Sequence, residues 1–271
     1  MDARWQLVAY VLVSIILRTV AAQLSQRRTD IAWVRFFSEG WPASALRFVY
    51  SIGLPYVALV LGVVPGRYLG LIRPDRLREP ASGSTSTFLG QARDYLSVVA
   101  FGWLPDLGTI AGLGAILMLF LGVTWLGYSY LRDVVRAEGR TSRASRQGNK
   151  GPGAVSVIYQ AVHWSFYRSA VWLLTDNLYM GVVGGIVLVG AEWLLDPGWI
   201  SRLHRAQTRD VLLVDASVLI ATSVIFFFVP NLWLLLPIHW LMATACQHLI
   251  VLEQGPTTDG LSEGLAYQAR D

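Results

Sequence analysis

The sequence predicts an all-α protein built as a polytopic transmembrane helical bundle. Hydrophobic residues make up 54% of the 271 residues and charged residues only 15%, whereas a soluble domain carries roughly a quarter charged residues. The apolar residues gather in seven segments, each close to the length of about 20 residues that a helix needs to cross the hydrocarbon core. The single cysteine, Cys246, excludes an intrachain disulfide. These observations exclude a soluble enzyme, a disordered chain and a disulfide scaffold.

The seven apolar segments are predicted to be helices, because a backbone in lipid must satisfy its own hydrogen bonds. Only four charged residues lie inside them. The apolar stretch 95–105 is too short to span the membrane by itself. It adds an eighth crossing if it crosses together with its neighbours. Otherwise this stretch lies in the membrane interface or enters and leaves on the same side. The segments cover residues 5–25, 48–66, 108–131, 155–174, 178–195, 211–229 and 232–252.

Charge patterning divides a single integral membrane domain, residues 1–271, into functional parts. The basic loop 132–153 carries six basic and two acidic residues but no aromatic residue, so it does not indicate nucleic-acid binding. The positive-inside rule places this loop and the C-terminus in the cytoplasm. We therefore expect a multi-pass protein of the cell membrane, whose partners are the lipid bilayer and other membrane proteins. Residues 1–131 are predicted as packing helices, 154–252 as the helices that carry a polar centre, and 253–271 as a tail.

Small and polar residues predict how the helices meet. Tight turns are expected at 176–177 and 230–231, where short polar pairs separate apolar segments. Arg18, near the end of the first segment, is expected to extend its guanidinium to the lipid headgroups. Glycines spaced four apart predict two close helix contacts, at Gly108 with Gly112 and at Gly181 with Gly185.

Ionisable side chains at membrane depth are candidates for a functional site, because their burial in lipid is expensive. Beyond Arg18, all of them lie in the C-terminal half, which predicts a polar centre among the last four segments. The helix rise places three of these residues about 5–6 Å from the cytoplasmic end of their helices and two of them about 20 Å from it. For the three shallow residues, a role as a helix cap or as an interfacial residue is the alternative to a functional role. The shallow members are Glu192, Asp215 and His248; His163 lies between; the deep pair is Arg168 and His239.

These positions carry a family resemblance. The stretch 163–168, His-Trp-Ser-Phe-Tyr-Arg, resembles the Glu-Glu-x-x-x-Arg helix of the CPBP (CAAX-protease and bacteriocin-processing, Abi-like) intramembrane metalloproteases. Residues 231–239 resemble the run that leads to the last family motif, His-x-x-x-Asn. Residues 188–192 stand where Phe-x-x-x-His falls, and 68–74 resemble the Leu-Gly-Leu-Arg-Arg-Pro connector. The resemblance implies a CPBP-like helical fold with His163, Trp164, Arg168, Glu192, His239 and Ala243 at the motif positions.

This chain departs from the family motifs at the positions that carry the catalytic chemistry. Trp164 occupies the position of the second glutamate, Glu192 that of the second-motif histidine, and Ala243 that of the final asparagine. A metal-activated water needs a carboxylate within hydrogen-bond reach as its base, and an indole cannot serve. We therefore expect a non-catalytic centre without a cofactor, in a protein that acts as a scaffold, a partner or an accessory subunit.

Two alternatives remain open. The chain is an active CAAX-type metalloprotease if His163, Glu192 and His239 form an altered ligand set for zinc, although the helix rise separates Glu192 from His239 by about 15 Å of depth. It is instead a subunit that binds haem or a chlorin if His163, His239 or His248 ligates that ring. His239 and His248 lie nine residues apart on opposite faces of one helix, so they cannot both ligate the same ring.

Overall fold

The computed structural model describes residues 3–26, 41–71, 88–138 and 153–253. Helices dominate these residues, and no strand occurs among them. The all-α class is therefore confirmed. The helices are α1 (Ala3–Gln26), α3 (Trp41–Phe48), α4 (Leu54–Val60), α5 (Phe88–Glu138), α6 (Ala154–Thr175), α7 (Leu178–Leu195), α8 (Trp199–His204), α9 (Ala206–Phe228) and α10 (Leu232–Glu253), with a π-helical segment η1 (Val49–Gly53) between α3 and α4.

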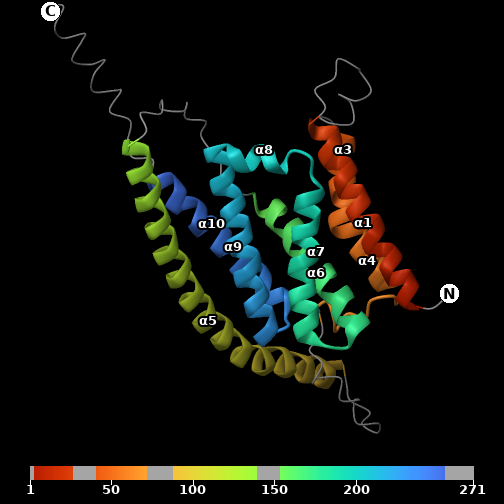
Figure 1. Ribbon diagram of the computed structural model, residues 1–271. Coiled ribbons are helices and arrows are strands. Elements are labelled where there is room, and N and C mark those ends of the chain that lie inside the picture. The colour runs from red at the N-terminus through yellow and green to blue at the C-terminus, as the bar shows by residue number, and fades with distance from the viewer. Residues whose placement is uncertain (1–2, 27–40, 72–87, 139–152, 254–271) are drawn as a thin grey trace, which may run out of the picture.

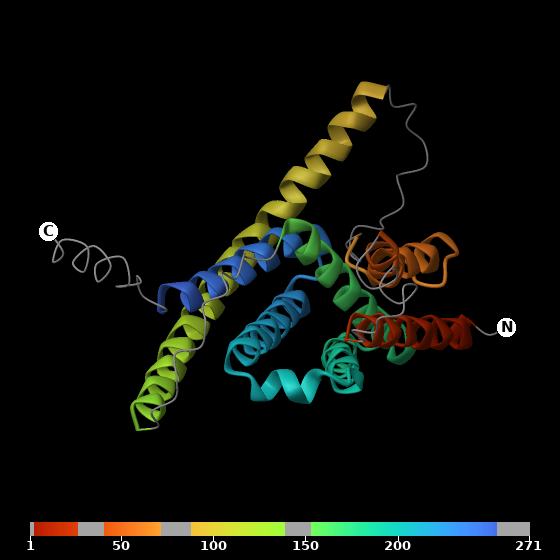
Figure 2. The same ribbon diagram turned by 90° about the horizontal axis from the view of Figure 1, so that it is seen from above.

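The helices form a bundle with a central group and two flanks (Figure 1). Helices α6, α7, α9 and α10 lie in the middle, α1 with α3 and α4 flank them on one side, and α5 flanks them on the other (Figure 2). Helix α1 packs on α6 and α7, whereas α5 packs on α9 and α10. The central helices therefore meet residues from both flanks.

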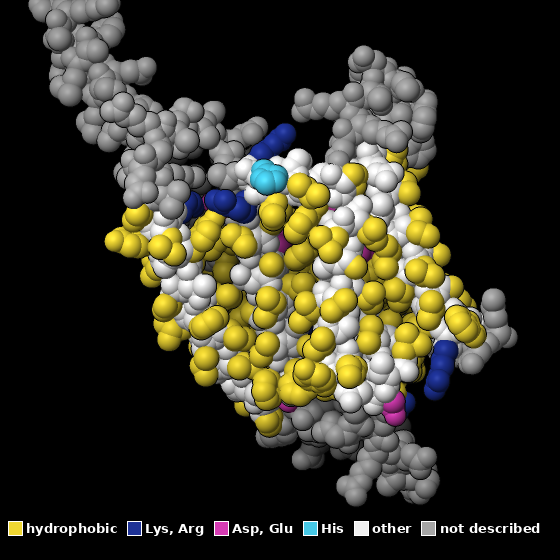
Figure 3. All heavy atoms as spheres, in the orientation of Figure 1, with side chains coloured by type: hydrophobic (Ala, Val, Ile, Leu, Met, Phe, Trp, Pro, Cys, Tyr) yellow, Lys and Arg dark blue, Asp and Glu magenta, His cyan; other side chains and the backbone are white. Residues whose placement is uncertain are grey.

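In the described part of the chain, five helical stretches are long and apolar enough to cross a membrane. Hydrophobic side chains cover the middle of the face seen in Figure 3, and basic side chains lie toward its two ends. The predicted count of about seven spans is not confirmed, because α6 and α10, which carry three of the histidines and other polar side chains, are not among the five. The five stretches are Arg4–Leu24, Trp41–Val60, Trp103–Arg132, Leu178–Leu195 and Thr208–Phe228.

Helix α5 accounts for the stretch 95–105, which the sequence left undecided. The stretch is continuous with the longer apolar part of the same helix and forms no separate crossing helix. Its first part runs across one end of the bundle and the rest runs along the side (Figure 1). Pro105 lies inside the helix, and an internal proline removes a hydrogen bond and kinks the chain. Of the basic loop 132–153, residues 139–152 lie outside the described part of the chain.

The two glycine pairs behave differently. A Cβ atom at Gly181 would lie 2.5 Å from Cβ of Trp172, and one at Gly185 would lie 2.4 Å from Cγ of Arg168. The predicted close contact of α6 with α7 is therefore confirmed. At Gly108 and Gly112, a Cβ atom would meet no described atom within 4 Å. The predicted contact there is wrong, because this face of α5 is turned away from the bundle.

The turns at 176–177 and 230–231 lie where the sequence predicted them. Asp176 adopts a left-handed conformation with φ of 52°, and the side chain of Asn177 caps α7 by accepting a hydrogen bond from the Met180 amide. Asn231 caps α10 in the same way through the amides of Trp233 and Leu234. Short polar side chains thus end one helix and begin the next.

The turn region 61–71 holds the second apolar segment against the centre. Gly70 has φ of 74°, and its carbonyl accepts a hydrogen bond from the Leu232 amide at 2.9 Å. Ser169 of α6 donates to the carbonyl of Tyr68 at 2.8 Å. Residues 68–71 of the connector that the family resemblance singled out therefore contact both α6 and the start of α10, while its residues 72–74 lie outside the described part of the chain.

Candidate functional site

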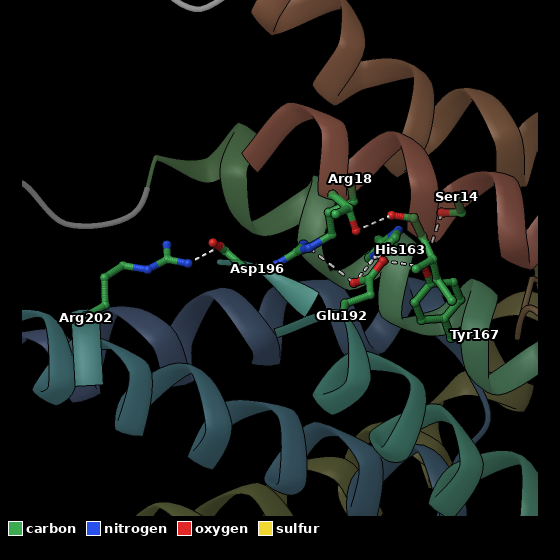
Figure 4. Close-up of polar contacts among 9 residues, drawn as sticks. Ser14, Arg18, His163, Tyr167, Glu192, Asp196 and Arg202 are labelled. Atoms are coloured by element: carbon green, nitrogen blue, oxygen red, sulfur yellow. Dashed lines mark hydrogen bonds and ion pairs between the residues drawn. The ribbon is translucent and has the colours of Figure 1, made fainter. Parts of the chain in front are cut away.

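The strongest polar cluster surrounds the carboxylate of Glu192, near the end of α7 (Figure 4). Glu192 is only 2% exposed. Nε2 of His163 lies 3.0 and 3.1 Å from its two oxygens, Nε of Arg18 lies 3.3 Å from Oε2, and the hydroxyl of Tyr167 donates to Oε1. We call these four residues the Glu192 network. Both oxygens of the carboxylate are engaged.

Helix α6 supplies two members of this network on one face. His163 and Tyr167 are spaced four apart, so their side chains lie one turn above the other. Both are buried, and their rings lie 4.6 Å apart. Tyr50 of η1 contacts His163 edge-on, with ring centroids 5.7 Å apart. A π-helical segment, which often marks a functional region, thus packs directly against the histidine.

Helix α1 supplies the positive charge of the network. Arg18 and Ser14 are also four apart and share one helix face. The Ser14 hydroxyl lies 3.3 Å from the Tyr167 oxygen; because Tyr167 donates its proton to Glu192, Ser14 is the donor of this contact. The Arg18 side chain is 31% exposed. The Arg18 side chain therefore extends from the surface to a buried carboxylate and does not interact with the lipid headgroups alone.

Two expectations are corrected by this network. Glu192 lies near the end of α7, as its shallow position required, but it is buried against α6 and α1, so the interfacial alternative is wrong. The polar centre was expected among the last four segments with the first three as packing, yet α1 contributes Ser14 and Arg18. The distance of a residue from the helix end does not reveal what packs over it, which is the reason for both errors.

A second buried cluster involves Arg168, His239 and Trp164. Arg168 is 1% exposed, so the prediction that it faces protein is confirmed. Its Nη1 donates to the carbonyl of Thr222 at 3.3 Å and lies 3.5 Å from the Ser223 hydroxyl. The His239 ring, which is fully buried, packs on Trp164 with centroids 5.1 Å apart. We call this group the Arg168 cluster.

The remaining candidates lie outside both clusters. Asp215 of α9 is half-buried and lies in the neighbourhood of Gln160 of α6 and of Arg18. His248 is exposed near the end of α10, as an interfacial residue would be. Ala243 is buried and adds no polar group.

The proposed zinc ligands are only partly brought together. His163 and Glu192 are in direct contact, whereas His239 belongs to the other cluster. Within the described part of the chain, no group of three or more His, Cys, Asp or Glu side chains is placed to hold a metal ion. A catalytic zinc needs three protein ligands, so the donor set present does not fit one.

Several polar residues were missed from the sequence. Asp210 of α9 is buried; its carboxylate accepts hydrogen bonds from Tyr128 and Arg132 of α5, both at 2.9 Å. Tyr167 and Ser14 were also missed. Their spacing of four from His163 and Arg18 was a usable signal, because such pairs share a helix face. No corresponding signal marked Asp210, whose partners are far away in the chain.

No family model, no curated protein and no solved structure matches this chain. Its function is therefore inferred from its own residues and their contacts.

Proposed function

We propose that this chain is an integral membrane protein of CPBP-like arrangement with a non-catalytic centre, which acts as a scaffold or accessory subunit for other membrane proteins. The single observation that carries the proposal is the closure of the Glu192 network. A catalytic carboxylate must keep an oxygen available for water or metal. Both oxygens of Glu192 are instead held by Arg18, His163 and Tyr167.

The residues at the other motif positions support the same conclusion. Trp164 stands where the resemblance calls for a glutamate, and its ring packs on His239. Ala243 stands where it calls for an asparagine. Both positions contribute packing, so no described residue next to His239 offers a base.

The proposed topology places the protein in the cell membrane with the basic loop 132–153 and the C-terminus in the cytoplasm. The support is the positive-inside rule. Four parts of the structure lie at one end of the bundle: the C-terminal end of α5, the start of α6, helix α8 and the C-terminal end of α10 (Figure 1). The segments that the rule assigns to the cytoplasm can therefore share one side of the membrane.

The proposal is tested by isolating the full chain from its own membranes in mild detergent under native conditions. We expect the chain to migrate in a complex larger than its own mass, with at least one other membrane protein at constant stoichiometry. A matched pair of variants tests whether the helical bundle binds the partner protein. Glu192→Gln removes the charge at the centre of the Glu192 network. Gly190→Ala is the control, because it alters the same helix at a position where a Cβ meets no described atom within 4 Å. The complex should weaken only in the first. A chain that migrates alone in wild-type membranes contradicts the proposal.

A second candidate is a metalloprotease with altered ligands. Two of its three donors, His163 and Glu192, are 3.0 Å apart, but the third, His239, would have to move from the other cluster to join them. Metal analysis of the same preparation separates the candidates. Stoichiometric zinc that disappears in His163→Ala supports the metalloprotease and contradicts the scaffold.

A further inference from the structure

The Arg168 guanidinium presents an unpartnered edge inside the bundle. Its Nη1 has acceptors, but Nε and Nη2 have no hydrogen-bond partner within the described chain, and the side chain is 1% exposed. Nε and Nη2 point their N–H bonds from the same edge of the planar group. This edge is the fork that binds two oxygens of one anion. The geometry of the orphaned atoms therefore specifies a bidentate acceptor.

No carboxylate of the described chain balances the Arg168 charge. The acidic side chains that form ion pairs have other partners: Glu192 pairs with Arg18 and His163, Asp210 with Arg132, and Asp196 with Arg202. The face of the guanidinium is covered by the Phe226 ring, 4.7 Å from its centroid, which leaves the edge for an anion. An arginine cannot lose its proton to escape such a site, so a buried counter-charge is required.

His239, which packs on Trp164 one turn before Arg168, adds a further unpartnered polar side chain to this buried region. The imidazole is fully buried, and neither ring nitrogen has a hydrogen-bond partner among the described residues. It lies close enough to Arg168 for their charges to interact. Trp164, one helical turn before Arg168 on α6, holds the ring by packing on it. A neutral imidazole carries one N–H donor, which complements the two N–H groups of the arginine.

We propose that Arg168 and His239 bind a singly charged carboxylate between α6, α9 and α10. A carboxylate has two oxygens in the plane that the guanidinium fork requires, and its one negative charge balances the one positive charge of Arg168. The carboxylate belongs either to a small water-soluble acid or to the head of a fatty acid from the bilayer. This site shares no residue with the Glu192 network and is independent of the proposed function.

The backbone of α7 orients the arginine toward this site. Gly185 lies against the aliphatic stem of Arg168, where a Cβ would be 2.4 Å from its Cγ. The stem therefore cannot move toward α7, and the guanidinium is directed to α9, where Thr222 and Ser223 hold Nη1. The fork is fixed before the anion binds, so little ordering is required on binding.

The test uses the full chain in bicelles with two probes, acetate and palmitate, each labelled with ¹³C at the carboxyl carbon. NMR measures the bound carboxyl signal as each probe is titrated. We expect a saturable signal at one carboxylate per chain. Saturation by acetate identifies a small-acid site, and saturation by palmitate alone identifies a lipid source; either supports the proposal. The absence of a saturable signal with both probes overturns it.

Variants assign the signal to the fork. Arg168→Lys keeps the charge but loses the paired N–H groups, and affinity should fall by about tenfold or more. Arg168→Met should abolish the signal, and His239→Phe, which keeps a ring on Trp164, should weaken binding several-fold. Arg202→Met, which removes an exposed arginine outside both clusters, is the matched control and should keep wild-type affinity. Unchanged affinity in Arg168→Lys, or loss of the signal in Arg202→Met while the chain remains folded, contradicts the assignment.

Discussion

The His163 ring on α6 and the Glu192 carboxylate on α7 are in direct contact at 3.0 Å, and both side chains are almost completely withdrawn from solvent. Because α1 adds Arg18 to the same carboxylate, one acidic residue connects three helices. A buried charge is tolerated only when it is paired and hydrogen bonded. The contact between His163 and Glu192 therefore stabilises the packing of α1, α6 and α7.

Replacing Glu192 should be the most damaging single change in this network. Glu192→Gln leaves Arg18 and His163 without their counter-charge, and we expect it to lower the free energy of unfolding by about 3–5 kcal/mol, the usual cost of breaking a buried pair. Denaturation in bicelles measures this loss. Arg202→Met is the control, because its ion pair with Asp196 is 40% exposed on the arginine side; exposed pairs contribute about 0–1 kcal/mol. Equal losses in the two variants would contradict this stabilising role for Glu192.

The glycines of α7 provide a test of the contact with α6. Gly185→Ala places a methyl group 2.4 Å from Cγ of Arg168, and we expect a loss of about 1–3 kcal/mol from overpacking. Gly190→Ala, on the same helix, meets no described atom within 4 Å and should stabilise the helix by up to about 1 kcal/mol. Thermal unfolding of both variants in one detergent gives the comparison. A neutral Gly185→Ala would show that α6 and α7 lie farther apart.

Two glycines with positive φ separate backbone strain from steric contact. Gly62 and Gly70 have φ of 69° and 74°, but only at Gly70 would a Cβ meet backbone atoms, at 2.9 Å from the Leu232 amide nitrogen and 3.0 Å from the Pro230 carbonyl oxygen. Gly62→Ala should cost about 1 kcal/mol from the left-handed conformation. Gly70→Ala should cost clearly more, because the turn must also move away from α10. Equal unfolding temperatures for the two variants would contradict the docking of region 61–71.

The attachment of α5 should depend on Asp210. Its carboxylate receives Tyr128 and Arg132 at 2.9 Å. Tyr128→Phe removes one hydrogen bond and should cost about 1 kcal/mol, whereas Asp210→Asn also removes the ion pair of Asp210 with Arg132 and should cost more. A double-mutant cycle between these positions should give a coupling energy of at least about 0.5 kcal/mol. If the losses of stability in the two single variants add up within error to the loss in the double variant, Tyr128 and Asp210 do not interact.

Hydropathy predicted the helices well, because the need to satisfy backbone hydrogen bonds in lipid leaves little choice of structure. The segment 178–195 coincides with α7, and the segments 5–25, 155–174 and 232–252 match α1, α6 and α10 within two residues. The segment 211–229 begins five residues after the start of α9, and 108–131 covers only part of α5, which begins at Phe88. The second segment was placed too late, because α3 begins at Trp41. Helix α8 was not predicted, since six residues give no clear period.

The sequence predicted only some members of the candidate site, Glu192, His163 and Arg168 among them, and it did not predict how they are grouped. Arg168 had to be buried because of its permanent charge, and it is. The partnership of Glu192 with Arg18 could not be predicted, because hydropathy does not tell which helices are neighbours. His163 and His239 were considered together on the basis of a motif, but they lie in different clusters. Residue type therefore identified the polar side chains, and tertiary packing decided their partners.

The most direct test of the central claim is the metal content of the purified full chain, measured by mass spectrometry of the elements together with His163→Ala and His239→Ala variants. The claim is that the carboxylate of Glu192 is engaged by protein and that its centre is non-catalytic. It predicts no stoichiometric zinc in the wild-type chain and no difference among the three proteins. One zinc ion per chain that disappears when either histidine is replaced would contradict it.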